Sequence, residues 1–145
     1  MKNYFKFFGI VALVVTIGLL TFGCSSDSDG DKNAELAGNW KSGNIVVRIK
    51  GAEGVFTVIE DDGIGWDQTR DKNQVKIGDK KFIDIKWFDV LKWRGQTLLY
   101  DPNNYNKAGF KRCTFTLSAD KKTLTVVVDS GLGYTEGSYG TYTKQ

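Results

Sequence analysis

Few residues of this chain could carry out acid–base or nucleophilic chemistry. Its 145 residues include no histidine and only two cysteines, Cys24 and Cys113. The lack of histidine excludes a His-ligated metal site and a catalytic triad built on histidine. Cys113 shares a face with Phe115 and Leu117 in an alternating stretch, so we expect a small buried side chain rather than a nucleophile. We therefore expect no catalytic residue, no metal site, no cofactor and no enzymatic activity.

The acidic residues are the other candidates for chemistry. Glu60, Asp61 and Asp62 follow one another, and Asp67 comes shortly after. Paired carboxylates can act as general acid and base or can bind a cation. However, Asp61 and Asp62 stand directly before Gly63 and directly after an apolar alternation, and Asp-Gly is typical of a turn. We interpret Asp61 and Asp62 as turn residues.

Aromatic side chains are the one set that suggests a binding site. Six of them in the middle and late chain are candidates for ligand contact: Trp66, Trp87, Trp93, Tyr100, Tyr105 and Tyr134. Trp66 and Tyr105 are flanked by Gly or Asn, so we expect them in loops, where a flat ring can stack on a sugar or line an apolar pocket. The alternative is that the rings pack in the core, which a domain of this size needs.

Residues 1–23 have the order of an export signal. Lys2 and Lys6 are followed by an uncharged run that extends from Phe7 to Gly23. A basic start, an apolar middle expected to be helical and a small residue at the end are typical of such a signal. The run is also close to the length of a membrane-spanning helix, so length alone does not separate the two interpretations.

The residues at the end of this run resemble the lipobox of bacterial lipoproteins. Gly23 directly precedes Cys24, although Thr21 stands where that family prefers Leu, with Leu20 one position earlier. The resemblance implies that the chain is cut before Cys24, that the cysteine thiol is diacylated (palmitate is the usual label), and that this lipid attaches the protein to a membrane.

Residues 24–35 are expected to be the lipidated cysteine and a flexible acidic tether. The Ser- and Asp-rich stretch 25–33 cannot bury enough apolar surface to fold, so its composition predicts a solvated linker. The stretch also resembles the export tag of Bacteroidetes surface lipoproteins. That resemblance implies a lipid-anchored protein of the outer membrane that faces the cell surface.

The net charge does not indicate an anionic partner. The whole chain carries 20 Lys and Arg against 17 Asp and Glu, and removal of Lys2 and Lys6 with the signal leaves 18 against 17. The basic residues of the folded part are interleaved with acids, so we expect them on the solvated surface and expect no nucleic acid partner. These residues are Arg48, Lys50, Lys72, Lys76, Lys80, Lys81, Lys86, Lys92 and Arg94.

Residues 36–145 are predicted to form one all-β domain. Six segments alternate apolar and polar residues as strands do: 44–50, 54–60, 74–88, 90–101, 112–118 and 122–129. Two apolar faces are expected, one formed by Ile45, Val47 and Ile49 and one by Ile83, Ile85 and Trp87. Weaker strand candidates are 40–41, 65–70 and 138–144. About eight short strands predict a small antiparallel β-barrel, with a β-sandwich as the alternative.

The start of this domain resembles the first strand of the lipocalin and calycin barrels. The resemblance is carried by Gly38-Asn39-Trp40. In that family the Trp plugs the closed end of the barrel, and a basic residue from the last strand packs across its ring. The resemblance therefore implies a barrel-closing pair of Trp40 and Lys144, with Arg112 as the other candidate for the basic residue.

These observations together indicate a binding protein. An eight-stranded barrel has an interior that is either filled by side chains or holds one small ligand. We expect a lipid-anchored surface protein that holds a small apolar ligand in the barrel or a glycan at its mouth. The alternative is a protein-interaction role, either as an inhibitor of a hydrolase or as an accessory subunit of an outer-membrane uptake complex.

Overall fold

The computed structural model describes residues 32–61, 65–101, 104–129 and 140–145. The predicted signal helix, Cys24 and Tyr134 lie outside these residues, as does the predicted tether as far as residue 31. None of the helices in the described ranges is long and apolar enough to cross a membrane.

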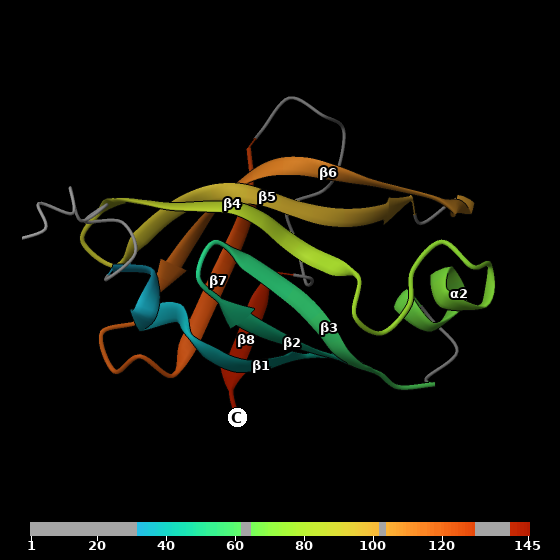
Figure 1. Cartoon of the computed structure of the whole chain (residues 1–145), viewed down its shortest axis with the longest axis horizontal. Coiled ribbons are helices and arrows are strands. Elements are labelled where there is room, and N and C mark those ends of the chain that lie inside the picture. Colours follow the sequence, from blue (N-terminus) through green and yellow to red (C-terminus); the bar gives the residue numbers. More distant parts are fainter. Residues whose placement is uncertain (1–31, 62–64, 102–103, 130–139) are drawn as a thin grey trace, which may run out of the picture.

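Eight antiparallel strands close into a barrel, with each strand paired to its neighbour in the chain and β8 paired to β1. Figure 1 shows the strands wrapped around one core. The strands are β1 (Gly38–Ser42), β2 (Ile45–Lys50), β3 (Glu53–Ile59), β4 (Lys80–Asp89), β5 (Lys92–Asp101), β6 (Asn104–Leu117), β7 (Thr123–Val128) and β8 (Thr141–Lys144). The prediction of an all-β barrel is confirmed, and the sandwich alternative is wrong because the sheet has no open edge.

The barrel has two different ends. The 3₁₀-helix η1 (Ala34–Leu36) lies at one end, together with the turns that join β2 to β3, β4 to β5 and β6 to β7. The short helix α2 (Trp66–Asp71) lies at the other end, in the connection from β3 to β4. Figure 1 shows η1 and α2 at opposite sides of the molecule. We call these the η1 end and the α2 end.

At most strand positions, the residues that alternate inward are buried in the barrel core, as predicted. Ile45, Val47 and Ile49 are all buried, and Cys113 is buried on the strand face that also carries Phe115. The predicted hairpin of the late chain is the pair β6 and β7, which is in register at Leu117↔Leu124, Thr116↔Thr125 and Phe115↔Val126.

Aromatic rings pack closely at the middle of the barrel. The Phe82 ring centroid lies 5.0 Å from that of Phe115 and 5.5 Å from that of Tyr142. A Cβ atom placed on Gly54 would lie 2.7 Å from Phe82 Cδ2, so glycine leaves the space that this ring occupies. This level of the barrel is therefore filled by side chains.

Three expectations about the strands are wrong. The weak strand candidate 65–70 is the helix α2, and residues 74–79 of the predicted segment 74–88 form no strand, because β4 begins only at Lys80. On β4, Ile85 is buried but Ile83 is only half-buried, so Ile83 does not belong to the predicted apolar face. Asp84 has φ 55°, and the register between β4 and β5 shifts between Ile83 and Lys86. A bulge of this kind reverses the inward and outward alternation.

The folded part begins before residue 36. Asn33, which we placed in the tether, is buried, and its Nδ2 donates a hydrogen bond of 2.9 Å to the carbonyl oxygen of Ile85. The first described residues therefore pack along β4.

Candidate functional site

Trp40 and Lys144 meet at the η1 end. Trp40 is fully buried, and its Nε1 donates a hydrogen bond of 2.8 Å to the carbonyl oxygen of Leu36 in η1. Lys144 Nζ lies 5.3 Å from the centroid of the Trp40 ring, a cation–π distance. Arg112, the other candidate for this position, is exposed on β6. The predicted contact between Trp40 and Lys144 is therefore present, and their role in closing the barrel stays a prediction.

The α2 end holds a buried lysine that we expected on the surface. Lys81 is 2% exposed, so the expectation of a solvated side chain is wrong. Its Nζ donates a hydrogen bond of 2.8 Å to Thr97 Oγ1 and a second, shorter one to the carbonyl oxygen of Leu98. Both acceptors belong to β5, and Thr97 is itself buried.

Aromatic rings surround this amine. Lys81 Nζ lies 4.7 Å from the centroid of the Trp66 ring and 5.5 Å from that of Phe82. The Trp66 ring in turn lies 5.1 Å from Phe56 and 4.8 Å, edge-on, from Tyr100. Rings from α2 and β4 thus lie against the amine, and rings from β3 and β5 pack on the Trp66 ring.

Burial makes Lys81 an unusual base. The loss of hydration lowers its pKa from the ordinary value of 10.5 to about 7, and the neighbouring Cys113 only partly opposes this shift. In the part of the chain that the structure describes, no ion pair joins Lys81 to a carboxylate. A neutral amine keeps two N–H donors, so both hydrogen bonds to β5 survive the loss of the proton. Burial also raises the pKa of Cys113 to about 12, which keeps that side chain a thiol.

Gly65 and α2 place Trp66 over the lysine. Trp66 is 4% exposed and is the first residue of α2, so the expectation of a ring presented from a loop is wrong. Gly65 has φ 70°, a left-handed conformation that favours glycine. A Cβ at this position would also lie 2.6 Å from the Tyr100 hydroxyl oxygen. Inside the helix, Thr69 Oγ1 donates a hydrogen bond of 3.1 Å to the Gly65 carbonyl oxygen.

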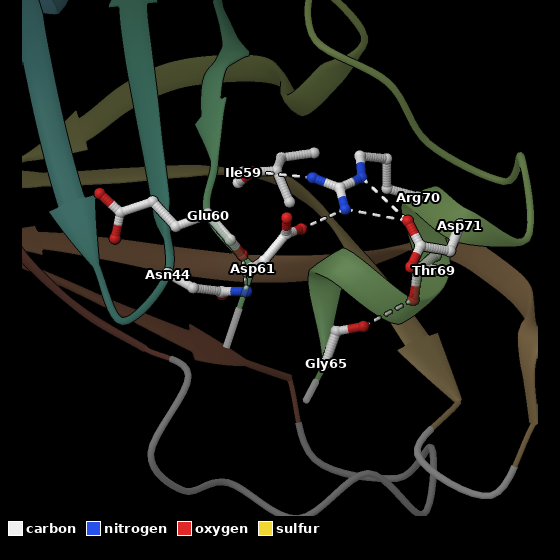
Figure 2. Close-up of polar contacts among 8 residues, drawn as sticks. All are labelled: Asn44, Ile59, Glu60, Asp61, Gly65, Thr69, Arg70 and Asp71. Atoms are coloured by element: carbon white, nitrogen blue, oxygen red, sulfur yellow. Dashed lines mark hydrogen bonds and ion pairs between the residues drawn. The ribbon is translucent and has the colours of Figure 1, made fainter. Parts of the chain in front are cut away.

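Arg70 attaches α2 to the end of β3 (Figure 2). Its Nη1 donates a hydrogen bond of 3.0 Å to the carbonyl oxygen of Ile59, and its Nη2 forms ion pairs with Asp61 and, at 2.9 Å, with Asp71. Asp61 therefore has a structural partner, and Glu60 pairs with Lys41 at 3.2 Å. The described ranges contain no group of three or more Cys, Asp or Glu side chains that could hold a metal ion.

The six aromatic candidates do not form one site. Trp66 and Tyr100 meet beside Lys81, whereas Trp93 is buried on β5 and faces Trp87 of β4 across the strand pair near the η1 end. Trp87 is half-buried. Tyr105 lies in β6 and not in the expected loop, and its side chain is outside the described part of the structure, as is all of Tyr134.

The local sequence contains no signal for the buried lysine. Lys81 and the next residue, Phe82, are both buried, so the burial of Lys81 does not follow from the alternation of a regular strand. The register between β3 and β4 shifts at this point, because Gly54 pairs with Phe82 and Val55 with Lys80, which leaves Lys81 as an extra residue on β4. Lys80 pairs with Glu53 at the surface, whereas Lys81 turns inward at this irregularity.

The fold defines a closed, eight-stranded antiparallel barrel, compatible with a lipocalin-like domain. No protein-family model matches the chain, and comparisons with curated proteins and with solved structures find no match either.

Proposed function

We propose that this protein is a lipid-anchored binding protein that holds a small apolar molecule with an anionic group at the α2 end of its barrel. The observation that carries the proposal is the amine of Lys81, which is buried among aromatic rings and has no carboxylate partner in the described ranges.

A carboxylate or a similar anion would complete this site. A buried ammonium group without a counter-ion is unfavourable, which is why the pKa of Lys81 falls to about 7. An anion beside Nζ would favour the charged form and raise that pKa. The ligand would thus supply a negative charge beside Nζ.

The rest of the ligand is proposed to be apolar. Phe56 and Tyr100 pack against the Trp66 ring, so they would offer ring surfaces to a ligand that displaces this ring, and small-molecule sites are lined mainly by such surfaces. A glycan would need a ring with an exposed face on which a sugar could stack. Trp66 and Tyr100 are both buried, so these rings support an apolar ligand rather than a glycan.

Access to Lys81 requires a movement of Trp66. The ring lies directly over the amine, and the helix that carries it has only six residues. A ligand that reaches Nζ would take the place of the Trp66 ring. The polar attachment of α2 shown in Figure 2 is largely at the surface, because the Asp61 and Asp71 side chains are 79% and 65% exposed.

The proposed location rests on the N-terminal sequence. The run that ends in Gly23-Cys24 and the Ser- and Asp-rich stretch after it support acylation of Cys24, export to the outer membrane and exposure at the cell surface. The Gly38-x-Trp40 start, together with the pairing of Trp40 and Lys144 at the η1 end, supports a lipocalin-like domain.

Native mass spectrometry tests the proposal. The full-length protein is purified from its own host in mild detergent and sprayed intact. We expect a retained small molecule that ionises as an acid and that is lost from the Lys81→Met variant but kept by Lys80→Met. A ligand that Lys81→Met retains fully would contradict the proposed site.

A protein-interaction role is the second candidate, and one observation favours it. The rings of Phe82, Phe115 and Tyr142 fill the middle of the barrel, which limits the room for a ligand there. An inhibitor of a hydrolase or an accessory subunit of an uptake complex needs no interior site. The same mass spectra would then show a bound protein and no small molecule.

A further inference from the structure

We infer that the tip of the β4–β5 hairpin, residues 87–91, rests on the surface of the bilayer that holds the lipid of Cys24. This inference depends on the proposed lipid anchor. It adds a second contact with the membrane and a fixed orientation of the barrel.

The hairpin tip exposes apolar side chains that the core does not use. Val90 is 75% exposed and Phe88 is 39% exposed, and Val90 is the most exposed large hydrophobic residue in the described part of the chain. Trp87 and Leu91 beside them are half-buried. Four of the five residues of this turn are therefore apolar and at least partly accessible, which marks an interaction site rather than a solvated turn.

The chain enters the barrel beside this tip. Lys32 Nζ lies 5.5 Å from the centroid of the Trp87 ring, and Asn33 is bonded to Ile85 of the same strand. Figure 1 shows η1 near the turn between β4 and β5. Cys24 is eight residues before Lys32, and eight extended residues span at most about 29 Å. A lipid on Cys24 therefore keeps the hairpin tip close to the membrane surface.

The charges around the tip suit a lipid surface. Lys86, Lys92 and Arg94 are exposed next to the tip, and the Arg94 guanidinium carbon lies 4.4 Å from the centroid of the Phe88 ring. The single acid of the tip, Asp89, lies 3.8 Å from Lys92. Aromatic and basic side chains side by side are typical of protein surfaces that sit among lipid head groups, especially anionic ones.

Docking by this tip would orient the binding site. The hairpin tip belongs to the η1 end, whereas Lys81 and α2 lie at the opposite end of the barrel. With the tip on the membrane, the α2 end faces away from the bilayer, where a ligand can reach it from the medium.

Tryptophan fluorescence in brominated vesicles tests this inference. The full-length acylated protein is reconstituted into vesicles of phosphatidylethanolamine and phosphatidylglycerol with or without bromine on the acyl chains. Trp40, Trp66 and Trp93 are buried in the barrel, so Trp87 is the ring that lipid bromine can reach. We expect bromine-dependent quenching in the wild type, none in Trp87→Phe, and a loss of most of it in Val90→Asp.

Val127→Asp is the matched control, because Val127 is 44% exposed on β7 near the α2 end. This variant should keep the quenching of the wild type. Equal quenching in Val90→Asp and Val127→Asp, or no quenching in an acylated protein that floats with the vesicles, would overturn the docking inference alone. A chain whose intact mass shows no acyl groups would overturn the anchor, and the docking inference with it.

Discussion

Lys81 and Trp66 form a buried cation–π pair, with Nζ of the lysine 4.7 Å from the centroid of the indole ring. The two residues come from different elements, since Lys81 lies on β4 and Trp66 begins α2. The indole stabilises the protonated amine, but burial outweighs this attraction and lowers the lysine pKa to about 7. The pair joins α2 to the barrel end that we propose as the binding site.

The free energy of unfolding should depend on pH through the titration of Lys81. Between pH 7 and pH 9 the unfolded chain keeps Lys81 protonated, because its ordinary pKa is 10.5, whereas the folded protein has lost this proton. The unfolded state then binds more protons, so the free energy of unfolding rises with pH, by at most about 1.4 kcal/mol per pH unit. Urea unfolding of Lys81→Met should lack this rise, and Lys80→Met should retain it.

A second titration limits this pH window. Cys113 has an ordinary pKa of 9.0, and burial raises it to about 12 in the folded protein. Above pH 9 the folded state therefore holds the additional proton of Cys113, and this contribution offsets the rise that Lys81 causes up to its ordinary pKa of 10.5. An unfolding free energy of the wild type that is flat between pH 7 and pH 9 would contradict the burial of a titrating lysine.

Gly65→Ala should destabilise the α2 end. The new Cβ meets the Tyr100 hydroxyl oxygen at 2.6 Å and the ring carbon behind it at 3.2 Å, at a residue with φ 70°. We expect a loss of about 2–3 kcal/mol in the free energy of unfolding. In a Tyr100→Phe background the closest atom is gone, so the same substitution should cost about 1 kcal/mol less. Equal costs in both backgrounds would show that the hydroxyl does not restrict Gly65.

Lys144→Met tests the closure of the η1 end. Lys144 is exposed, and its contact with the Trp40 ring is a cation–π interaction at 5.3 Å. Contacts of this kind at exposed sites contribute about 0.5–1 kcal/mol, so we expect a loss of that size in thermal or urea unfolding. Arg112→Met, the matched change of an exposed basic residue away from Trp40, should leave stability within about 0.5 kcal/mol of the wild type.

The fold could be predicted largely from the sequence because barrel strands leave a local signal. Ile45, Val47 and Ile49 alternate with polar neighbours, and burial of one face follows from that period alone. The reversal of the inward and outward alternation of β4 after Ile83 could not be predicted in this way. It depends on the positive φ of Asp84 and on the register between β4 and β5. Closure of the barrel likewise depends on the long-range pairing of Trp40 with Lys144.

The candidate site was much less predictable than the fold. A helix of six residues such as α2 is unstable alone, so it depends on the packing of Trp66 against the barrel and on the bonds of Arg70 to the end of β3. The burial of Lys81 depends in turn on Trp66 and on acceptors in β5. The formation of α2 and the burial of Lys81 both depend on contacts between distant parts of the chain, and the local sequence does not show such contacts.

Cys24→Ser tests the proposed anchor. Cells that express the wild type in the presence of labelled palmitate should incorporate label into the protein, and the variant should not. The wild type should also fractionate with membranes and become accessible to a protease added to whole cells. Equal labelling of both chains would contradict acylation of Cys24, without bearing on Lys81 or the barrel.

The most direct measurement of the central claim is a fluorescence titration with a polyene fatty acid and with the alcohol of the same chain. An ion pair with Lys81 should make the wild type bind the acid about tenfold to a hundredfold more tightly than the alcohol. Lys81→Met should bind both probes equally, whereas Lys80→Met should keep the preference. Failure of the wild type to bind the acid, or a preference for the acid that survives in Lys81→Met, would contradict the account.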